Sequence, residues 1–290
     1  MNDKADKKEG MQTIDKQAKD KQTKDRQIQD RQNEDNHDNG RKGIYFLPSL
    51  FTTAGLFFGF YAIIQSTHGN FEKAAIGVLI AMIMDGLDGR VARWTNTASD
   101  FGKEYDSLVD LIAFGLAPAL VMYFWSLQVI GKAGWLTAFL YAAATALRLA
   151  RFNTLTIKDS RYFYGIPCPA AAAFMVFWVW NFHESGISGQ SMPWSSAFAT
   201  LIMAVLMVSN VKFRSFKDFD LINRIPFAIL IVFLVIFVLI FFDPPRVLFL
   251  MAFAYGASGP IGWLFRWYRG TSESPAFLPD NSDDDEDAEG

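Results

Sequence analysis

Long apolar stretches fill the middle of the chain and predict membrane-spanning helices. The stretch over 226–242 contains no charged residue across a length close to the hydrophobic thickness of a bilayer. Comparable stretches alternate with short polar segments, so the pattern predicts an all-α polytopic membrane protein with about eight transmembrane helices. The predicted segments are 44–65, 74–93, 106–127, 134–155, 166–182, 194–210, 226–242 and 245–266.

The charged residues are concentrated at the two ends of the chain. Although 51% of the 290 residues are hydrophobic and only 20% are charged, residues 1–42 hold 21 of the 57 charged side chains and residues 271–290 hold 8. This distribution argues against a water-soluble enzyme. We expect a disordered charged tail over 1–42, a transmembrane domain over 43–270 and an acidic disordered tail over 271–290. The net charge of −3 is the sum of the charges of the tails and of the membrane domain, and it gives no reason to expect a nucleic-acid partner.

The basic residues between the predicted helices indicate the orientation in the membrane. With a cytoplasmic N-terminus, 15 Lys and Arg residues lie on the cytoplasmic side and 3 on the other side, namely Lys73, Lys132 and Arg246. Short cytoplasmic loops retain Lys and Arg. The bias therefore predicts that both termini are cytoplasmic.

Several common kinds of site and signal are not expected. The single cysteine, Cys168, cannot form an intramolecular disulfide and reads as a small buried residue. The three histidines fall in the N-terminal tail and in predicted outer loops, which argues against a histidine-based site. No apolar stretch precedes Ile44, so we expect no cleavable signal peptide and a first membrane helix that acts as the targeting signal.

Four aspartates stand out because acidic residues are rare at membrane depth. The residues between the tails include only 12 acidic side chains, and four of these are Asp85, Asp88, Asp106 and Asp110. On helices, spacings of three and four residues put each pair on one face. Both pairs lie at predicted cytoplasmic helix ends, so we expect the four carboxylates to converge. Oxygen-only ligands indicate a hard divalent cation, Mg²⁺ or Mn²⁺.

Residues between the aspartates suggest phosphate chemistry. Gly86 and Gly89 leave the helix backbone open to a bulky ligand, and Arg93 places a guanidinium one turn after Gly89. A phosphate bridged by two metals beside an arginine fits in-line phosphoryl displacement. The combination therefore predicts a two-metal phosphotransfer site.

These residues form a pattern that resembles a known signature. The stretch from Asp85 to Arg93 reads DGLDGRVAR, and eight residues later the stretch from Gly102 to Asp110 reads GKEYDSLVD. Together they match DxxDGxxAR, eight residues, GxxxDxxxD without a departure, and the chain is thereby similar to the CDP-alcohol phosphatidyltransferases.

The resemblance implies a fold and roles for the motif residues. It implies a six-helix catalytic core with two additional helices, a homodimer, and a place in a bacterial inner membrane with the active site on the cytoplasmic side. By the same resemblance, the four aspartates hold two divalent metals, Mg²⁺ or Mn²⁺, and Asp110 is also the general base. The residues implied to contact the CDP group of the lipid donor are Gly89, Arg93 and Ser99.

Two further stretches resemble the phosphatidylserine synthase branch of this family. RLARFN begins at Arg148, and GIPCPAAA begins at Gly165. The opening LPSLFT also resembles that branch, with one departure, because Ser49 stands where the branch usually has Asn. The resemblance implies transfer of the phosphatidyl group of CDP-diacylglycerol to L-serine, with release of CMP.

The acceptor site has candidate residues and open alternatives. Arg148 and Arg151 could receive the serine carboxylate through paired hydrogen bonds, and Asn153 lies nearby. Both arginines could instead set topology or bind lipid phosphates, and Asn153 could be a helix cap. Glycerol 3-phosphate, inositol or inositol phosphate are alternative acceptors. An ion-coupled transporter would also use intramembrane carboxylates, and a catalytically silent scaffold is a third hypothesis.

Overall fold

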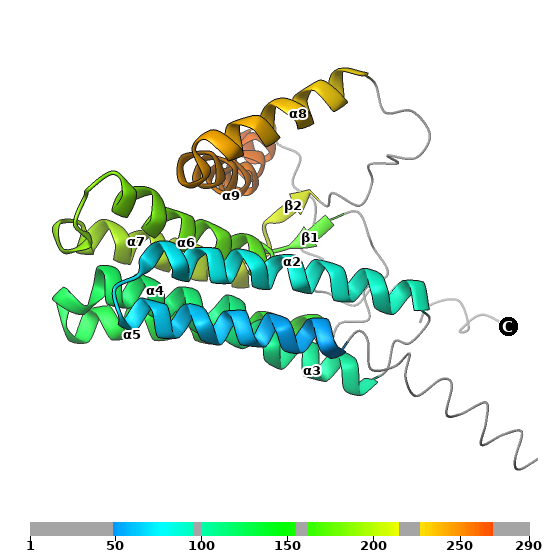
Figure 1. Cartoon of the computed structure of the whole chain (residues 1–290), viewed down its shortest axis with the longest axis horizontal. Coiled ribbons are helices and arrows are strands. Elements are labelled where there is room, and N and C mark those ends of the chain that lie inside the picture. The colour runs from blue at the N-terminus through cyan, green and yellow to red at the C-terminus, as the bar shows by residue number, and fades with distance from the viewer. Residues whose placement is uncertain (1–48, 96–99, 155–161, 215–226, 269–290) are drawn as a thin grey trace, which may run out of the picture.

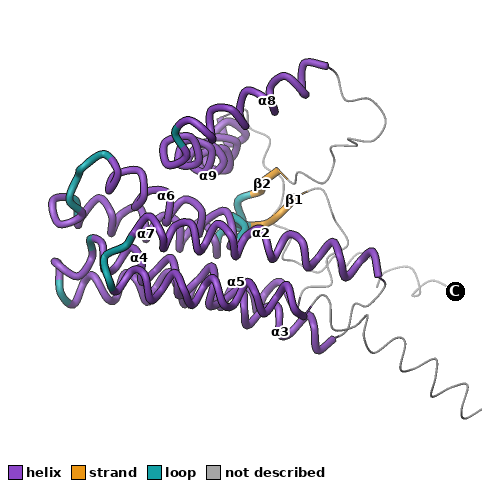
Figure 2. The backbone as a smooth tube through the Cα atoms, viewed as in Figure 1, coloured by secondary structure: helices purple, strands orange, loops and turns teal. Residues whose placement is uncertain are grey.

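The protein is helical apart from one short β-ribbon (Figures 1 and 2). The computed structural model describes residues 49–95, 100–154, 162–214 and 227–268. The helices are an N-terminal helix Ser49–Thr67, α2 Phe71–Thr95, α3 Asp100–Asp110, α4 Ala117–Trp125, α5 Lys132–Thr154, α6 Cys168–Glu184, α7 Pro193–Val208, α8 Phe227–Phe242 and α9 Pro244–Tyr268. Shorter elements are a π-helix Leu111–Leu116, the 3₁₀ turns Leu127–Ile130 and Gly189–Ser191, and the strands β1 Tyr162–Tyr164 and β2 Lys212–Arg214.

A helix occupies each of the eight predicted membrane segments within the described residues. Four helical segments are long and apolar enough to cross a membrane, and α7 and most of α8 are shorter apolar helices. The predicted third segment is one helical rod made of α3, the π-helix and α4. These features confirm an all-α polytopic membrane protein, while the count of eight crossings stays a prediction. The predicted tails 1–42 and 271–290 lie outside the described residues.

The short β-ribbon was not expected from the hydrophobic pattern. β1 pairs with β2 in antiparallel register, with Phe163 opposite Phe213. Because β1 follows α5 and β2 follows α7, the ribbon ties together two segments at the same end of the bundle (Figure 2). Its strands are only three residues long, too short for a period-two pattern to be read.

Small residues let the helices approach one another closely. A Cβ added at Gly59 of the N-terminal helix would lie 2.9 Å from the Cα of Ala113 in the π-helix. One added at Gly115 would lie 3.2 Å from the Thr145 side chain of α5. Close backbone approach at small residues is typical of membrane helix packing. These contacts fix the N-terminal helix and α5 on either side of the rod that carries Asp106 and Asp110.

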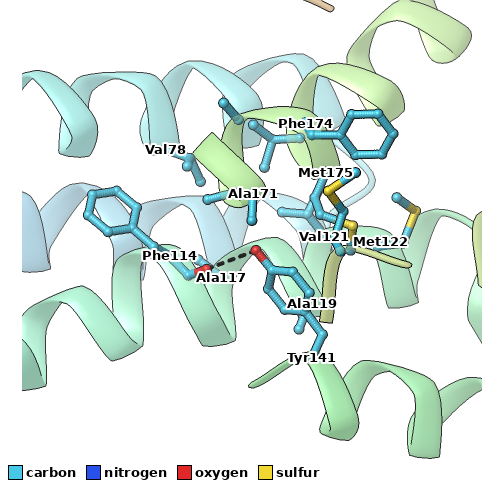
Figure 3. Close-up of a cluster of buried hydrophobic side chains, with 14 of the residues drawn as sticks. Val78, Phe114, Ala117, Ala119, Val121, Met122, Tyr141, Ala171, Phe174 and Met175 are labelled. Atoms are coloured by element: carbon cyan, nitrogen blue, oxygen red, sulfur yellow. Dashed lines mark hydrogen bonds between the residues drawn. The ribbon is translucent and has the colours of Figure 1, made fainter. Parts of the chain in front are cut away.

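A buried core lies where α2, α4, α5 and α6 meet (Figure 3). In its centre the Tyr141 hydroxyl donates a hydrogen bond to the Phe114 carbonyl oxygen, with the two oxygens 3.1 Å apart. Pro118, four residues after Phe114, has no N–H to offer that carbonyl. The tyrosine therefore satisfies a backbone acceptor at the point where the π-helix passes into α4.

The last two helices form a layer outside this core. α9 packs against α6 through aromatic rings that include Phe174, Trp178 and Phe249. α8 packs against α9, and large apolar side chains from Leu230 to Phe242 are exposed along it. An apolar helix exposed in this way suits contact with lipid.

Gly165 closes the ribbon and starts the approach to α6. Its φ of +76° lies in the left-handed region, and its N–H donates a hydrogen bond to the Val211 carbonyl oxygen at 2.9 Å. A Cβ at this position would lie 2.4 Å from the Met207 carbonyl oxygen. The glycine of the GIPCPAAA stretch is therefore required by backbone geometry, both for its conformation and for its contact with the end of α7.

Replacing Gly165 by alanine is expected to destabilise the protein. Strain from a non-glycine residue at positive φ costs roughly 1–3 kcal/mol, and the backbone contact adds to it. Thermal unfolding of the detergent-purified variant measures the loss. Gly186→Ala is the matched control, because Gly186 has a φ of +72° but nothing within 4 Å of an added Cβ. A Gly165→Ala protein as stable as Gly186→Ala would contradict the role of the Met207 contact.

Candidate metal centre

The four aspartates lie on α2 and α3, which both reach the same end of the bundle (Figure 1), and all four line one pocket. Asp85 and Asp88 are in the C-terminal half of α2, and Asp106 and Asp110 are in α3. α2 ends at Thr95 and α3 begins at Asp100, so the connection is short. The helical spacing and the short connection together place the two pairs on the same pocket.

Three of the four carboxylates approach one another closely. One ligand oxygen from each of Asp85, Asp106 and Asp110 lies within 4.8 Å of the other two, and all three residues are half-buried. Asp88 lines the same pocket and is only 7% exposed. Its Oδ2 accepts a hydrogen bond from Thr52 Oγ1 of the N-terminal helix. The carboxylates of Asp85, Asp106 and Asp110 therefore form a close group, and Thr52 holds the Asp88 carboxylate beside it.

The donor set fits a hard divalent cation. Carboxylates this close, in a partly dehydrated pocket, repel one another unless cations or protons intervene. Oxygens on opposite sides of one Mg²⁺ lie about 4.2 Å apart, given Mg–O distances of 2.0–2.1 Å. The 4.8 Å limit on the carboxylate oxygens is close to that span, so small side-chain rotations would bring them around one ion. The cavity between these residues is small, about 10 Å³.

Asp110 occupies a special position along the rod. It is the last residue of α3, and the helix widens into π geometry over Leu111–Leu116 directly after it. Segments of π-helix occur frequently at functional sites. The next two residues that contact the pocket, Ala113 and Phe114, belong to this segment and are buried. Carboxylates and buried apolar side chains thus both line the pocket.

The glycine face predicted for phosphate approach is open. A Cβ added at Gly86 or at Gly89 would meet nothing within 4 Å. Arg93 is exposed one helical turn after Gly89. A bulky anionic ligand could therefore reach the helix backbone beside the aspartates. Ser99, the third residue expected to contact the CDP group, lies outside the described residues.

The three residues predicted for the acceptor have different hydrogen-bond partners. Arg151 Nη2 donates to Asn210 Oδ1 at 2.8 Å, and Asn153 Nδ2 donates to Ser107 Oγ at 2.9 Å. Both side chains thereby join neighbouring segments of the fold. Arg148 is the residue of this set whose positive charge is close enough to Asp110 to interact with it.

The Arg148 guanidinium does not use all of its hydrogen-bond donors strongly within the described residues. Its Nη1 donates to Cys168 Sγ at 3.4 Å, and sulfur is a weak acceptor. Its Nε is buried and has no hydrogen-bond partner among the described residues. Its positive charge also interacts with Asp110. A guanidinium with an unmet donor beside the candidate base is suited to an anionic group of a bound substrate.

Thr52 is a polar residue of the pocket to which the sequence pattern alone assigned no role. It lies in the opening stretch that resembles the synthase branch, but threonine in an apolar helix is common. The spacing of Thr52, Gly55 and Gly59 is the signal that was available, because it puts the three residues on one face of the N-terminal helix. That face is the one buried against α2 and the rod.

A larger pocket lies at the opposite end of the bundle. It is lined by loop residues such as Gly69, Gly186 and Gln190, together with His183. Phe71, at its edge, is about 20 Å along α2 from Asp85 by the rise of an α-helix. The carboxylate cluster found among the described residues is not at this end. Size alone therefore does not identify the site.

The carboxylate pocket lies within a region of the chain that matches a known protein family. The family model described as CDP-alcohol phosphatidyltransferase matches residues 45–211, a range that includes all four aspartates and Arg148. A CDP-diacylglycerol–serine O-phosphatidyltransferase of Helicobacter pylori (strain ATCC 700392 / 26695) is 39% identical over 226 residues, 77% of this chain and 92% of that protein.

Two more distant relatives cover less of the chain. A protein of the same name from Bacillus subtilis (strain 168) is 32% identical over 174 residues, 59% of this chain and 92% of its own. An archaetidylserine synthase of Methanothermobacter thermautotrophicus is 34% identical over 169 residues, 58% of this chain and 69% of its own. With a family model over more than half of its length and the four signature aspartates lining one pocket, this chain belongs to the CDP-alcohol phosphatidyltransferase family.

Proposed function

We propose that the protein transfers the phosphatidyl group of CDP-diacylglycerol to L-serine and releases CMP. The observation that carries the proposal is the group of carboxylates of Asp85, Asp106 and Asp110, within 4.8 Å of one another, in a membrane enzyme of this family. The serine acceptor is supported by the names of the Helicobacter and Bacillus relatives. A transporter would not require the donor-side glycine and arginine residues of the signature.

Asp85, Asp88, Asp106 and Asp110 are the residues that would hold two divalent ions, Mg²⁺ or Mn²⁺. When bound, such ions polarise the diphosphate and stabilise charge on the attacking and leaving oxygens. Asp110 additionally accepts the proton of the serine hydroxyl. The serine oxygen then forms a bond to the lipid-side phosphorus while the bond from that phosphorus to the bridging oxygen breaks. CMP departs with that oxygen.

The donor binds along the open face of α2. Gly89 allows the diphosphate to approach the backbone, and Arg93 neutralises part of its charge. Ser99 would contact the same group. The apolar chains of the donor remain in the bilayer, beside the exposed apolar residues that surround the helix ends. This geometry needs no movement of the lipid into water.

The acceptor binds on the α5 side of the carboxylates. Arg148 is the best candidate for the serine carboxylate, because its guanidinium has an unmet donor and lies near Asp110. Arg151 and Asn153 then act mainly by holding α5 to its neighbours. Nothing among the described residues favours a phosphorylated acceptor over serine.

The protein would work in a bacterial cytoplasmic membrane, with both termini and the active site on the cytoplasmic side. Support comes from the 15-to-3 distribution of basic residues and from the bacterial relatives. We also propose a homodimer, as the family resemblance implies. The tails and the loops that hold Lys158, Arg161, Lys217 and Arg224 lie outside the described residues.

An acceptor assay tests the proposal. Purified protein with CDP-diacylglycerol and Mn²⁺ or Mg²⁺ is expected to release CMP when serine is added and to lose this activity with a chelator. Glycerol 3-phosphate, inositol and inositol phosphate serve as parallel acceptors. Activity with one of them and none with serine would reject the serine assignment while leaving the donor chemistry intact.

A further inference from the structure

We propose that Thr52 is a positioning residue that orients the Asp88 carboxylate for metal binding. The inference rests on the proposed function, because it assigns Asp88 to the metal centre. Thr52 lies outside the aspartate signature and on a different helix. It therefore extends the centre from α2 and α3 to the N-terminal helix.

The contact itself is buried and directional. Thr52 is 6% exposed and Asp88 is 7% exposed, and both line the pocket that also contains Asp85, Asp106 and Asp110. The Thr52 hydroxyl donates to Oδ2 of Asp88. Asp88 is also the one signature aspartate that does not belong to the three-carboxylate group. Its orientation is therefore set by a partner on another helix.

A single hydroxyl contact of this kind suits a metal ligand. A carboxylate has two oxygens, so a hydrogen bond to Oδ2 leaves Oδ1 for a cation and fixes the plane of the group. Such outer partners orient ligands, and their loss typically weakens metal affinity by about 10–100-fold. The backbone supports this role, since Gly59 holds the same helix against Ala113 with no room for a side chain.

The next residue supplies a matched comparison. Thr53 also has a hydroxyl on this helix, and its Oγ1 lies 3.1 Å from the Tyr105 hydroxyl of α3. Thr53 is exposed and does not line the carboxylate pocket. Both threonines connect the N-terminal helix to a helix of the site, but only Thr52 contacts an aspartate of the signature. A general loss of helix packing should affect both positions.

The experiment measures binding of Mn²⁺ alone to the full-length purified protein, by the electron paramagnetic resonance signal of free Mn²⁺. Thr52→Val keeps the side-chain shape without the hydroxyl and is expected to weaken binding by about 10–100-fold. Thr52→Ala also removes the hydroxyl and adds no bulk, so it should cause the same loss of Mn²⁺ affinity. It serves as the second variant if Thr52→Val does not fold. Thr52→Ser should restore most of the affinity. Thr53→Val should bind Mn²⁺ like the wild type.

Activity gives an independent readout. At saturating Mn²⁺ the Thr52→Val protein should recover most of the wild-type kcat, because a high Mn²⁺ concentration compensates for the weaker metal binding of a poorly oriented ligand. Wild-type affinity in Thr52→Val and Thr52→Ala, an equal loss in Thr53→Val, or no Mn²⁺ binding by the wild type would each overturn the inference. Failure of the serine assignment is seen separately, as an absence of serine-dependent CMP release from a wild type that binds Mn²⁺.

Discussion

Asp110→Asn is expected to lower kcat for serine-dependent CMP release by roughly 10²–10⁴-fold, the range supplied by a positioned general base. Asparagine keeps the size of the side chain and an oxygen that can face a cation, but its amide cannot accept the serine proton. Steady-state kinetics at saturating serine and CDP-diacylglycerol measure the loss. Raising the Mn²⁺ concentration should not restore the rate, which separates loss of the base from weaker metal binding.

Asp100→Asn provides the control for this prediction. Asp100 is on the same helix, is exposed in its first turn, and loses the same charge on substitution. It should retain activity close to that of the wild type. A near-normal kcat for Asp110→Asn at saturating metal would reject Asp110 as the base. It would leave the residue only a role in metal binding.

The part of the site that could be predicted from the sequence is the part that depends on local geometry. Asp85 and Asp88 share a helix face because of their spacing, as do Asp106 and Asp110. A connection of only a few residues keeps the two pairs at the same end of the bundle. The rarity of charge among the apolar stretches made these residues conspicuous, so the acidic pocket followed from composition and spacing. The helical segments followed from hydrophobic length in the same way.

The contacts that could not be predicted depend on how helices distant in sequence rotate against one another. Asp88 meets Thr52, 36 residues earlier, and Arg151 meets Asn210, 59 residues later. Neither spacing carries a periodic signal. Arg148 and Arg151 look equivalent in the sequence of α5, yet the Asn210 side chain accepts a hydrogen bond from Arg151. The β-ribbon that brings these segments together is too short to be read from sequence.

The π-helix is a second feature that sequence patterns do not show. In the sequence, Leu111–Leu116 reads as ordinary apolar helix. Pro118 was the available signal, because it leaves the Phe114 carbonyl without an N–H partner four residues later. Tyr141 supplies that partner from α5 (Figure 3). The bond links the rod that carries Asp110 to the helix that carries Arg148.

Arg148→Ala is expected to reduce kcat/KM for serine by about 10–100-fold, since a charged hydrogen bond contributes roughly 1.5–3 kcal/mol. Most of the loss should be in KM for serine, with KM for CDP-diacylglycerol near its wild-type value. Ethanolamine, which is serine without its carboxylate, isolates the interaction. The wild type should prefer serine strongly, and Arg148→Ala should lose most of that preference without becoming faster with serine.

Arg151→Ala is the matched control, three residues away on the same helix. Its guanidinium bonds to Asn210, so the variant should lose stability in thermal unfolding and keep the preference for serine over ethanolamine. An Arg148→Ala protein that raised KM for CDP-diacylglycerol as much as KM for serine would show that Arg148 binds donor phosphate. If Arg151→Ala instead erased the preference for serine, the carboxylate site would lie about one turn further along α5.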